Sequence, residues 1–183
     1  TGKILRILEA QGDYNKGVEY IDVCIKKIGK DSESWSDCVL QKAESLIMAY
    51  NKTSDNNYLK SAMDAYESLL AKMPNSTYVL NNMAYLLAEN DKDLNKAMEY
   101  AKRACDARPD NPMYLDTYAF ACYKNGKYAE AAQLSQAAIQ QYEAQQIVTP
   151  VEVYEHLGQS QEKLGNKSQA LAAYQQALEA GGE

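Results

Sequence analysis

Small residues recur along the chain at nearly regular intervals, and this recurrence limits the possible folds more than any other feature. The segments KNGKYAEAAQLSQAA (124–138) and KLGNKSQALAAYQQA (163–177) share one frame, Lys-x-Gly followed by alanines five and twelve residues after the glycine. The corresponding first small residues of five copies are 45, 35, 34 and 39 residues apart: Gly17, Ala62, Ala97, Ala131 and Ala170. Self-similarity at such a period is typical of chains built from stacked supersecondary units.

A second set of small residues precedes the last four copies, at Ala43, Ala84, Ala119 and Gly158. A small residue on each of two antiparallel helices allows their axes to approach closely, while larger side chains one turn away interlock. Around Ala119, Leu115, Tyr118 and Cys122 complete the i, i+3, i+4, i+7 spacing of one helical face. The sequence therefore predicts paired helices and no strands. The expected helices are roughly 1–10, 14–28, 34–50, 57–72, 78–89, 93–106, 112–125, 128–144, 150–164 and 167–180.

These landmarks resemble the tetratricopeptide repeat (TPR) family, whose unit is a helix pair of about 34 residues. The matching landmarks are YEHLG (154–158), Gly126-Lys127-Tyr128, Ala170 with Tyr174 and Ala177, and the trailing Pro74 and Pro109. The resemblance implies an all-α, right-handed α-solenoid of antiparallel helix pairs, with about 4.5–5 units and about ten helices. The implied repeats of one domain over 1–183 are approximately 1–31, 34–74, 77–110, 111–146 and 150–183. The run over 91–131 further resembles the closing repeats of bacterial TPR proteins, including envelope lipoproteins.

Two insertions interrupt the regular period. The second repeat contains about seven extra polar residues, NKTSDNN (51–57), whose turn-forming residue types predict a loop inside the pair. The link to the fifth repeat has about five extra residues, which we expect to lengthen a helix through QQYEAQQ (140–146) before Thr149-Pro150 opens the next helix.

Charge and composition argue against several classes of function. The net charge of −6, with few Lys/Arg clusters, disfavours a nucleic-acid or anionic-membrane surface. No apolar run is long enough to span a bilayer. The four cysteines, Cys24, Cys38, Cys105 and Cys122, lack C-x-x-C spacing, and one histidine cannot complete a zinc site, so we expect no metal or cofactor.

We expect no catalytic activity, since no nucleophile stands beside a plausible base. The single histidine, His156, is four residues after Glu152, which predicts an ordinary exposed pair on a helix surface.

The family resemblance implies that the first helix of each pair lines a concave groove that receives an extended peptide or a partner's helix. The candidate groove residues of the third and fourth repeats are Tyr78, Asn81, Tyr85, Met113, Asp116, Phe120 and Tyr123. One class within the family binds the C-terminal carboxylate of chaperones through basic residues and asparagine. Here the corresponding places carry Asp116, Tyr78 and Glu155, which favours a neutral-to-basic or aromatic protein partner instead.

Three alternatives remain open from the sequence. Tyr85 and Phe120 could be core residues between repeats rather than binding residues. The chain could be a structural spacer that self-associates through apolar solenoid ends, where Ile4, Leu5, Ile7 and Leu8 are exposed candidates. It could also be an accessory domain of a larger polypeptide. The cytoplasm and a bacterial periplasm or envelope are both compatible with the sequence, because a targeting signal could lie outside it.

Overall fold

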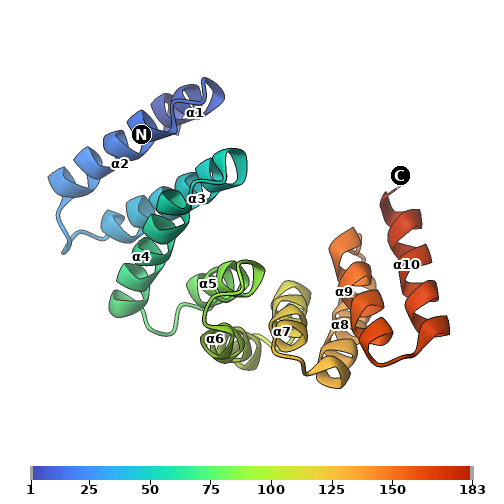
Figure 1. Cartoon of the computed structure of the whole chain (residues 1–183). Coiled ribbons are helices and arrows are strands. Elements are labelled where there is room, and N and C mark those ends of the chain that lie inside the picture. The colour runs from blue at the N-terminus through green and yellow to red at the C-terminus, as the bar shows by residue number, and fades with distance from the viewer. Residues whose placement is uncertain (1, 182–183) are drawn as a thin grey trace. The chain divides into compact units, whose positions relative to one another are not determined.

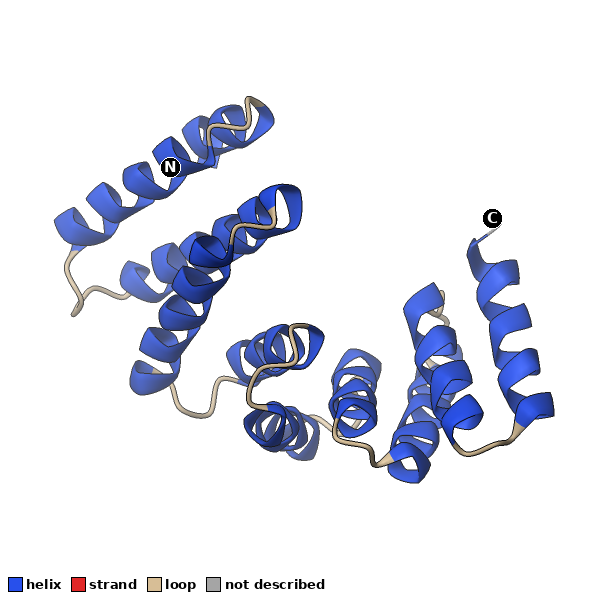
Figure 2. Ribbon diagram, in the orientation of Figure 1, coloured by secondary structure: helices blue, strands red, loops and turns tan. Residues whose placement is uncertain are grey.

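The computed structural model describes residues 2–181, which form ten α-helices and no strands (Figure 1). Short loops join successive helices (Figure 2). The helices are α1 (Gly2–Ala10), α2 (Tyr14–Ile28), α3 (Ser34–Thr53), α4 (Asn56–Lys72), α5 (Thr77–Glu89), α6 (Leu94–Ala107), α7 (Pro112–Lys124), α8 (Tyr128–Ala144), α9 (Val151–Lys163) and α10 (Lys167–Gly181). The prediction of an all-α chain of about ten helices is confirmed.

Successive helices pack as pairs, and the recurring small residues are buried, with Gly158 of α9 directly against Tyr174 of α10. The most extensive packing joins α3 to α4, α5 to α6, α7 to α8 and α9 to α10. Ala84 and Ala97 are fully buried in the α5–α6 pair, and Ala119 and Ala131 are buried in the α7–α8 pair. The spacing that revealed the repeats is therefore the packing requirement of the helix pair.

The chain divides into two compact units, Thr1–Pro74 and Asn75–Glu183. The repeat bounds expected for a single domain over 1–183 stay a prediction. In the first unit, the core of α2, α3 and α4 contains Ile21, Leu46, Tyr66 and Leu69, each almost completely buried. The second unit contains the three helix pairs from α5 to α10, and the candidate groove residues all belong to it.

The expected loop at 51–57 is wrong in extent. Helix α3 continues to Thr53 and α4 begins at Asn56, so only two residues connect them. The Thr53 hydroxyl donates to the carbonyl of Ala49 at 2.7 Å, Ser54 takes the left-handed conformation, and Asp55 accepts from the backbone N–H of Asn57 at 2.9 Å. The polar residues therefore lengthen both helices and cap their ends rather than forming a loop.

The link between the fourth and fifth repeats follows the prediction more closely. Helix α8 has 17 residues and ends at Ala144, and α9 begins directly after Pro150. Between them, the Gln145 side-chain amide donates to the carbonyl of Asp110 at 2.7 Å, while Thr149 is buried. This link fixes the start of α9, one of the helices that carry the candidate site.

All four cysteines are free thiols, with Cys105 and Cys122 buried and Cys24 and Cys38 half-buried. Within residues 2–181, no group of three or more His, Cys, Asp or Glu side chains is arranged to hold a metal ion. None of the helices described is both long and apolar enough to cross a membrane.

Candidate protein-binding surface

Helices α5, α7 and α9 are the first helices of three successive pairs, and α7 packs against both of the others. One aromatic side chain from each helix joins a continuous row, which we call the aromatic row: Tyr85, Phe120 and His156. The ring centroids of Tyr85 and Phe120 are 5.7 Å apart, with the planes tilted by 35°. Those of Phe120 and His156 are 4.6 Å apart in a stacked arrangement. The row crosses the three helices and ties the repeats of this unit together.

The internal repeat explains why Tyr85 and Phe120 lie side by side. Tyr85 directly follows Ala84, and Phe120 directly follows Ala119. Each alanine is buried in its pair, so the next residue projects from a different face of the first helix. Because the two pairs have equivalent geometry, the two rings meet between neighbouring first helices.

His156 is not the exposed surface residue that its spacing to Glu152 predicts. Its side chain is only 11% exposed, and its Nδ1 atom lies 2.9 Å from Oδ1 of Asp116, whose side chain is 16% exposed. A hydrogen bond from Nδ1–H to the carboxylate forms in the protonated ring and in one neutral tautomer. The i, i+4 rule describes neighbours on one helix, whereas this pair joins α9 to α7.

The structure brings together three of the seven predicted site residues: Tyr85, Asp116 and Phe120. Phe120 stacks on the same histidine that Asp116 binds, and Tyr85 contacts Phe120. Tyr85 is 39% exposed, while Phe120 and Asp116 are half-buried. These residues both pack between repeats and present part of their surface to solvent.

The other four predicted residues have different surroundings. Tyr78 and Met113 are exposed, by 45% and 54%. Tyr123 is half-buried and its ring contacts Tyr128 of α8, with centroids 5.5 Å apart. Asn81 is buried, and its Oδ1 atom has no hydrogen-bond partner in the described part of the chain. Asn81 therefore supplies an unsatisfied acceptor rather than an open contact.

Carboxylates from three helices act on the hydroxyl of Tyr85. The pKa of this hydroxyl is raised to about 12, first by burial and then by the charges of Glu89, Asp116 and Glu152. The Tyr85 hydroxyl donates a long hydrogen bond of 3.4 Å to Glu89. Asp116 and Glu152 also raise the pKa of Tyr142, after burial as the first cause. The aromatic row thus lies in a negative local environment.

One cation lies beside this row. The ammonium of Lys124 is 5.7 Å from the centre of the Phe120 ring and 2.7 Å from Oδ1 of Asp91. Because Asp91 pairs with it, Lys124 does not neutralise Glu89 or Glu152. No Lys or Arg within residues 2–181 forms an ion pair with either of those two glutamates.

Sequence reasoning missed His156 as part of the site. The signal was present, since Val153, His156, Leu157 and Ser160 follow the i, i+3, i+4, i+7 spacing, and all four are buried or half-buried. From that face, His156 reaches Asp116 and Phe120 of the preceding repeat.

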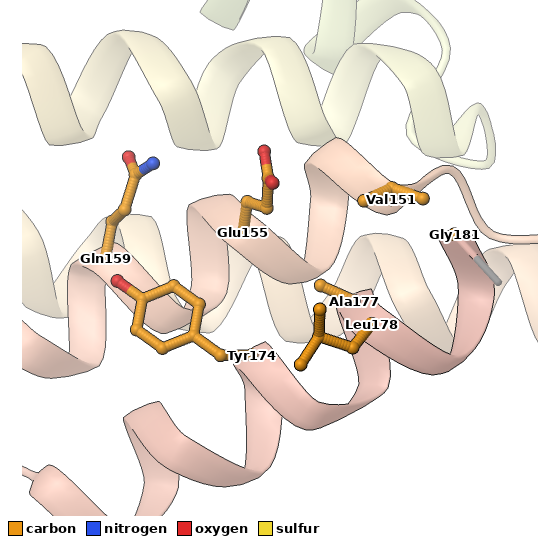
Figure 3. Close-up of a pocket in the computed structure, with 7 residues that line it drawn as sticks. All are labelled: Val151, Glu155, Gln159, Tyr174, Ala177, Leu178 and Gly181. Atoms are coloured by element: carbon orange, nitrogen blue, oxygen red, sulfur yellow. The ribbon is translucent and has the colours of Figure 1, made fainter.

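A second surface lies on α9 and α10, where seven residues line a hollow (Figure 3). Its lining residues are Val151, Glu155, Gln159, Tyr174, Ala177, Leu178 and Gly181. Leu178 is 77% exposed, whereas Ile139, the residue 39 positions earlier on α8, is 3% exposed. Helix α8 is the second helix of the preceding pair, and α9 packs against it. The hollow therefore has the position that a further helix covers in the repeat before it.

Stacked helix pairs with conserved internal spacing make this chain a helical repeat protein, an all-α solenoid. The tetratricopeptide repeat family model matches residues 77–111 and 151–180. These two segments are tetratricopeptide repeats, as the sequence resemblance predicts.

Similar proteins agree with this assignment. A TPR repeat-containing protein of Pseudomonas aeruginosa is 27% identical over 122 residues, which make up 65% of this chain. The chain spans only 20% of that relative's length.

Solved structures show the same fold at low sequence identity. A crystal structure of MamA has a TM-score of 0.72 at 13% identity, covering 98% of this chain and 95% of MamA. MamA of Desulfovibrio magneticus has a TM-score of 0.66 at 12% identity, covering 97% of this chain and 90% of that one. The TPR-like repeats of a putative kinesin light chain of Podospora anserina have a TM-score of 0.74 at 15% identity, covering 97% of this chain and 91% of that one. The matched tetratricopeptide repeats support a protein–protein interaction scaffold as the general class of function.

Proposed function

We propose that the surface formed by α5, α7 and α9 binds a segment of a partner protein. The observation that carries the proposal is the aromatic row. Its exposed end is Tyr85, which packs against Phe120, and Phe120 stacks on His156. Asp116 holds His156 from the same helix that carries Phe120. A ring fixed in this way offers contact area without losing much rotamer freedom on binding.

Residues around the row supply further contacts. Tyr78 and Met113 are exposed at positions that the repeat pattern assigns to the same surface. Asn81 is only 4% exposed, so it lies beneath this surface and is not one of the contacts. Aromatic anchors of this kind are enriched among residues that dominate binding energy.

Quantitative affinity capture from the native organism tests this proposal. The double variant Tyr85→Ala, Phe120→Ala is compared with wild type and with the control Leu171→Ala, which removes an exposed side chain of α10 that does not line the hollow. We expect partners to be lost with the first variant and retained with the control. Circular dichroism checks that helicity persists.

Because the double variant also removes packing, Met113→Glu provides an independent arm. Met113 is 54% exposed, so a charge there leaves the core intact. Partner capture that survives both Met113→Glu and the double variant, with folded protein in each case, would contradict the proposal.

A second candidate function is self-association through apolar ends, as the spacer hypothesis holds. Two observations favour it: the hollow on α9–α10, and the exposure of Ile4 and Ile7 by 50% and 56% on α1. The side chain of Leu5, named in the same hypothesis, lies outside the described residues. Light scattering of wild type, Leu178→Lys and Ile7→Glu tests it, and a wild-type monomer over the micromolar range rules it out.

A further inference from the structure

We propose that the segment bound at this surface is basic, with a lysine or arginine side chain of the partner lying against Tyr85 between Glu89 and Glu152. This inference rests on the proposed function, because it concerns the same surface and names the chemistry of its ligand. It follows from the charges, the acceptors and the ring geometry around Tyr85.

The charges near Tyr85 come from three different helices. Glu89 is the last residue of α5, Asp116 lies within α7, and Glu152 lies in the first turn of α9. Burial is the largest cause of the raised pKa of the Tyr85 hydroxyl, and the negative charges of all three residues raise it as well. Asp116 is occupied by His156, whereas Glu89 and Glu152 are exposed. Two carboxylates therefore remain available to an incoming cation.

The exposed carboxylates of Glu89 and Glu152 accept hydrogen bonds and donate none when ionised. Lysine and arginine side chains carry only donors, whereas an acidic segment would add acceptors and like charge. Hydrogen bonding and charge at the two glutamates thus favour the same class of ligand.

The exposed ring of Tyr85 is suited to the same ligand. An ammonium or guanidinium group is attracted to the face of an aromatic ring within about 6 Å of its centre. The chain already contains this arrangement beside the row, where Lys124 lies 5.7 Å from the centre of Phe120 and 2.7 Å from Asp91. A partner's cation on Tyr85 and Glu89 would repeat that combination of ring and carboxylate.

Selection from a random dodecapeptide phage library on the immobilised full chain tests the inference without knowledge of the partner. We expect selected peptides to be enriched in Lys and Arg at least about twofold over the input library. Synthetic copies should bind about tenfold more weakly to the Glu89→Gln, Glu152→Gln variant, and binding should weaken as NaCl rises from about 50 to about 500 mM.

A matched variant separates a local site from the general attraction of an acidic protein. Glu143→Gln with Glu179→Gln makes the same change in net charge at exposed positions on α8 and α10. If this control weakens binding as much as Glu89→Gln, Glu152→Gln, the enrichment is nonspecific and the inference is overturned.

The outcomes also distinguish this inference from the proposed function. Peptides that require Tyr85 and Phe120 but show no basic enrichment overturn the inference and leave the binding surface standing. Peptides of any composition whose binding is unchanged by Tyr85→Ala, Phe120→Ala overturn both. Tyr85→Phe, which keeps the ring and removes the hydroxyl, should retain binding if the ring face and the carboxylates hold the cation.

Discussion

Gly158 of α9 lies directly against the ring of Tyr174 on α10: a Cβ atom at Gly158 would be 2.5 Å from Cε1 and 2.7 Å from Cδ1. The Tyr174 hydroxyl donates to Glu162 on α9 at 3.0 Å, which holds the ring in place. The close approach of the two helices therefore depends on the absence of a side chain at this one position.

Gly158→Ala should consequently destabilise the chain. Alanine favours a helix over glycine by about 1 kcal/mol, whereas overpacking costs about 1–3 kcal/mol. We expect a net loss of about 1 kcal/mol, measured by urea unfolding. Replacing Tyr174 with Leu as well should make Gly158→Ala neutral or stabilising. A stabilising effect of Gly158→Ala alone would show that the Tyr174 ring moves aside freely.

The contact between His156 and Asp116 should contribute to the stability of the second unit. Both side chains are largely buried, so removing one partner leaves a buried polar group unsatisfied, at a cost of about 1–3 kcal/mol. We expect His156→Ala and Asp116→Asn to be destabilising. Their double-mutant cycle should give a coupling energy of about 0.5–3 kcal/mol.

The same cycle on Lys102 and Asp106 serves as the control. That ion pair is 2.7 Å long, but both side chains are more than half exposed, so solvent screens it. Its coupling should be clearly smaller than that of His156 and Asp116. Additive effects at His156 and Asp116 would mean that stacking on Phe120, rather than the hydrogen bond, holds the histidine.

The helix pairs could be predicted from the sequence because each depends on contacts between neighbours in the chain. The small residues mark where two helices touch, and Gly126 and Gly165 mark turns, with φ of 76° and 78°. The residue types at 51–57 do not distinguish a loop from two helix ends, because Asn, Ser, Asp and Thr suit both. The bond from Thr53 to Ala49 decides between them, and it forms only once α3 has continued that far.

The candidate site was only partly predictable for a related reason. Tyr85 and Phe120 occupy equivalent places in successive repeats, so the period alone predicts that they lie on neighbouring helices. The pairing of His156 with Asp116 depends on how one helix pair is rotated against the next, which residue spacing within a helix does not encode.

The four cysteines should differ widely in reactivity. Burial and then the charge of Glu130 raise the pKa of Cys122 to about 12, and the residue has no exposed surface. Cys24 and Cys38 are only half-buried. With DTNB at pH 8 we expect Cys24 and Cys38 to react first and Cys122 to react at least about a hundredfold more slowly, because the thiolate is the nucleophile. In guanidinium all four should react alike, and rapid labelling of Cys122 in the native chain would contradict its burial.

Alkaline pH should destabilise the chain through its buried tyrosines, and Tyr118 offers the sharpest test. Burial raises the pKa of Tyr118 most, and its hydroxyl donates to Glu130 at 2.8 Å, which raises the pKa further. A phenol whose pKa is higher in the folded state stabilises that state fully below its unfolded pKa of about 10, and this stabilisation is lost as pH rises toward the folded pKa. The urea concentration at the unfolding midpoint, measured from pH 8 to 11, should therefore decrease once the pH exceeds about 10.

The variant Tyr118→Phe should be less stable than wild type at pH 8 but should lose less stability between pH 10 and 11. Parallel curves for wild type and Tyr118→Phe would show that this hydroxyl does not control the alkaline transition.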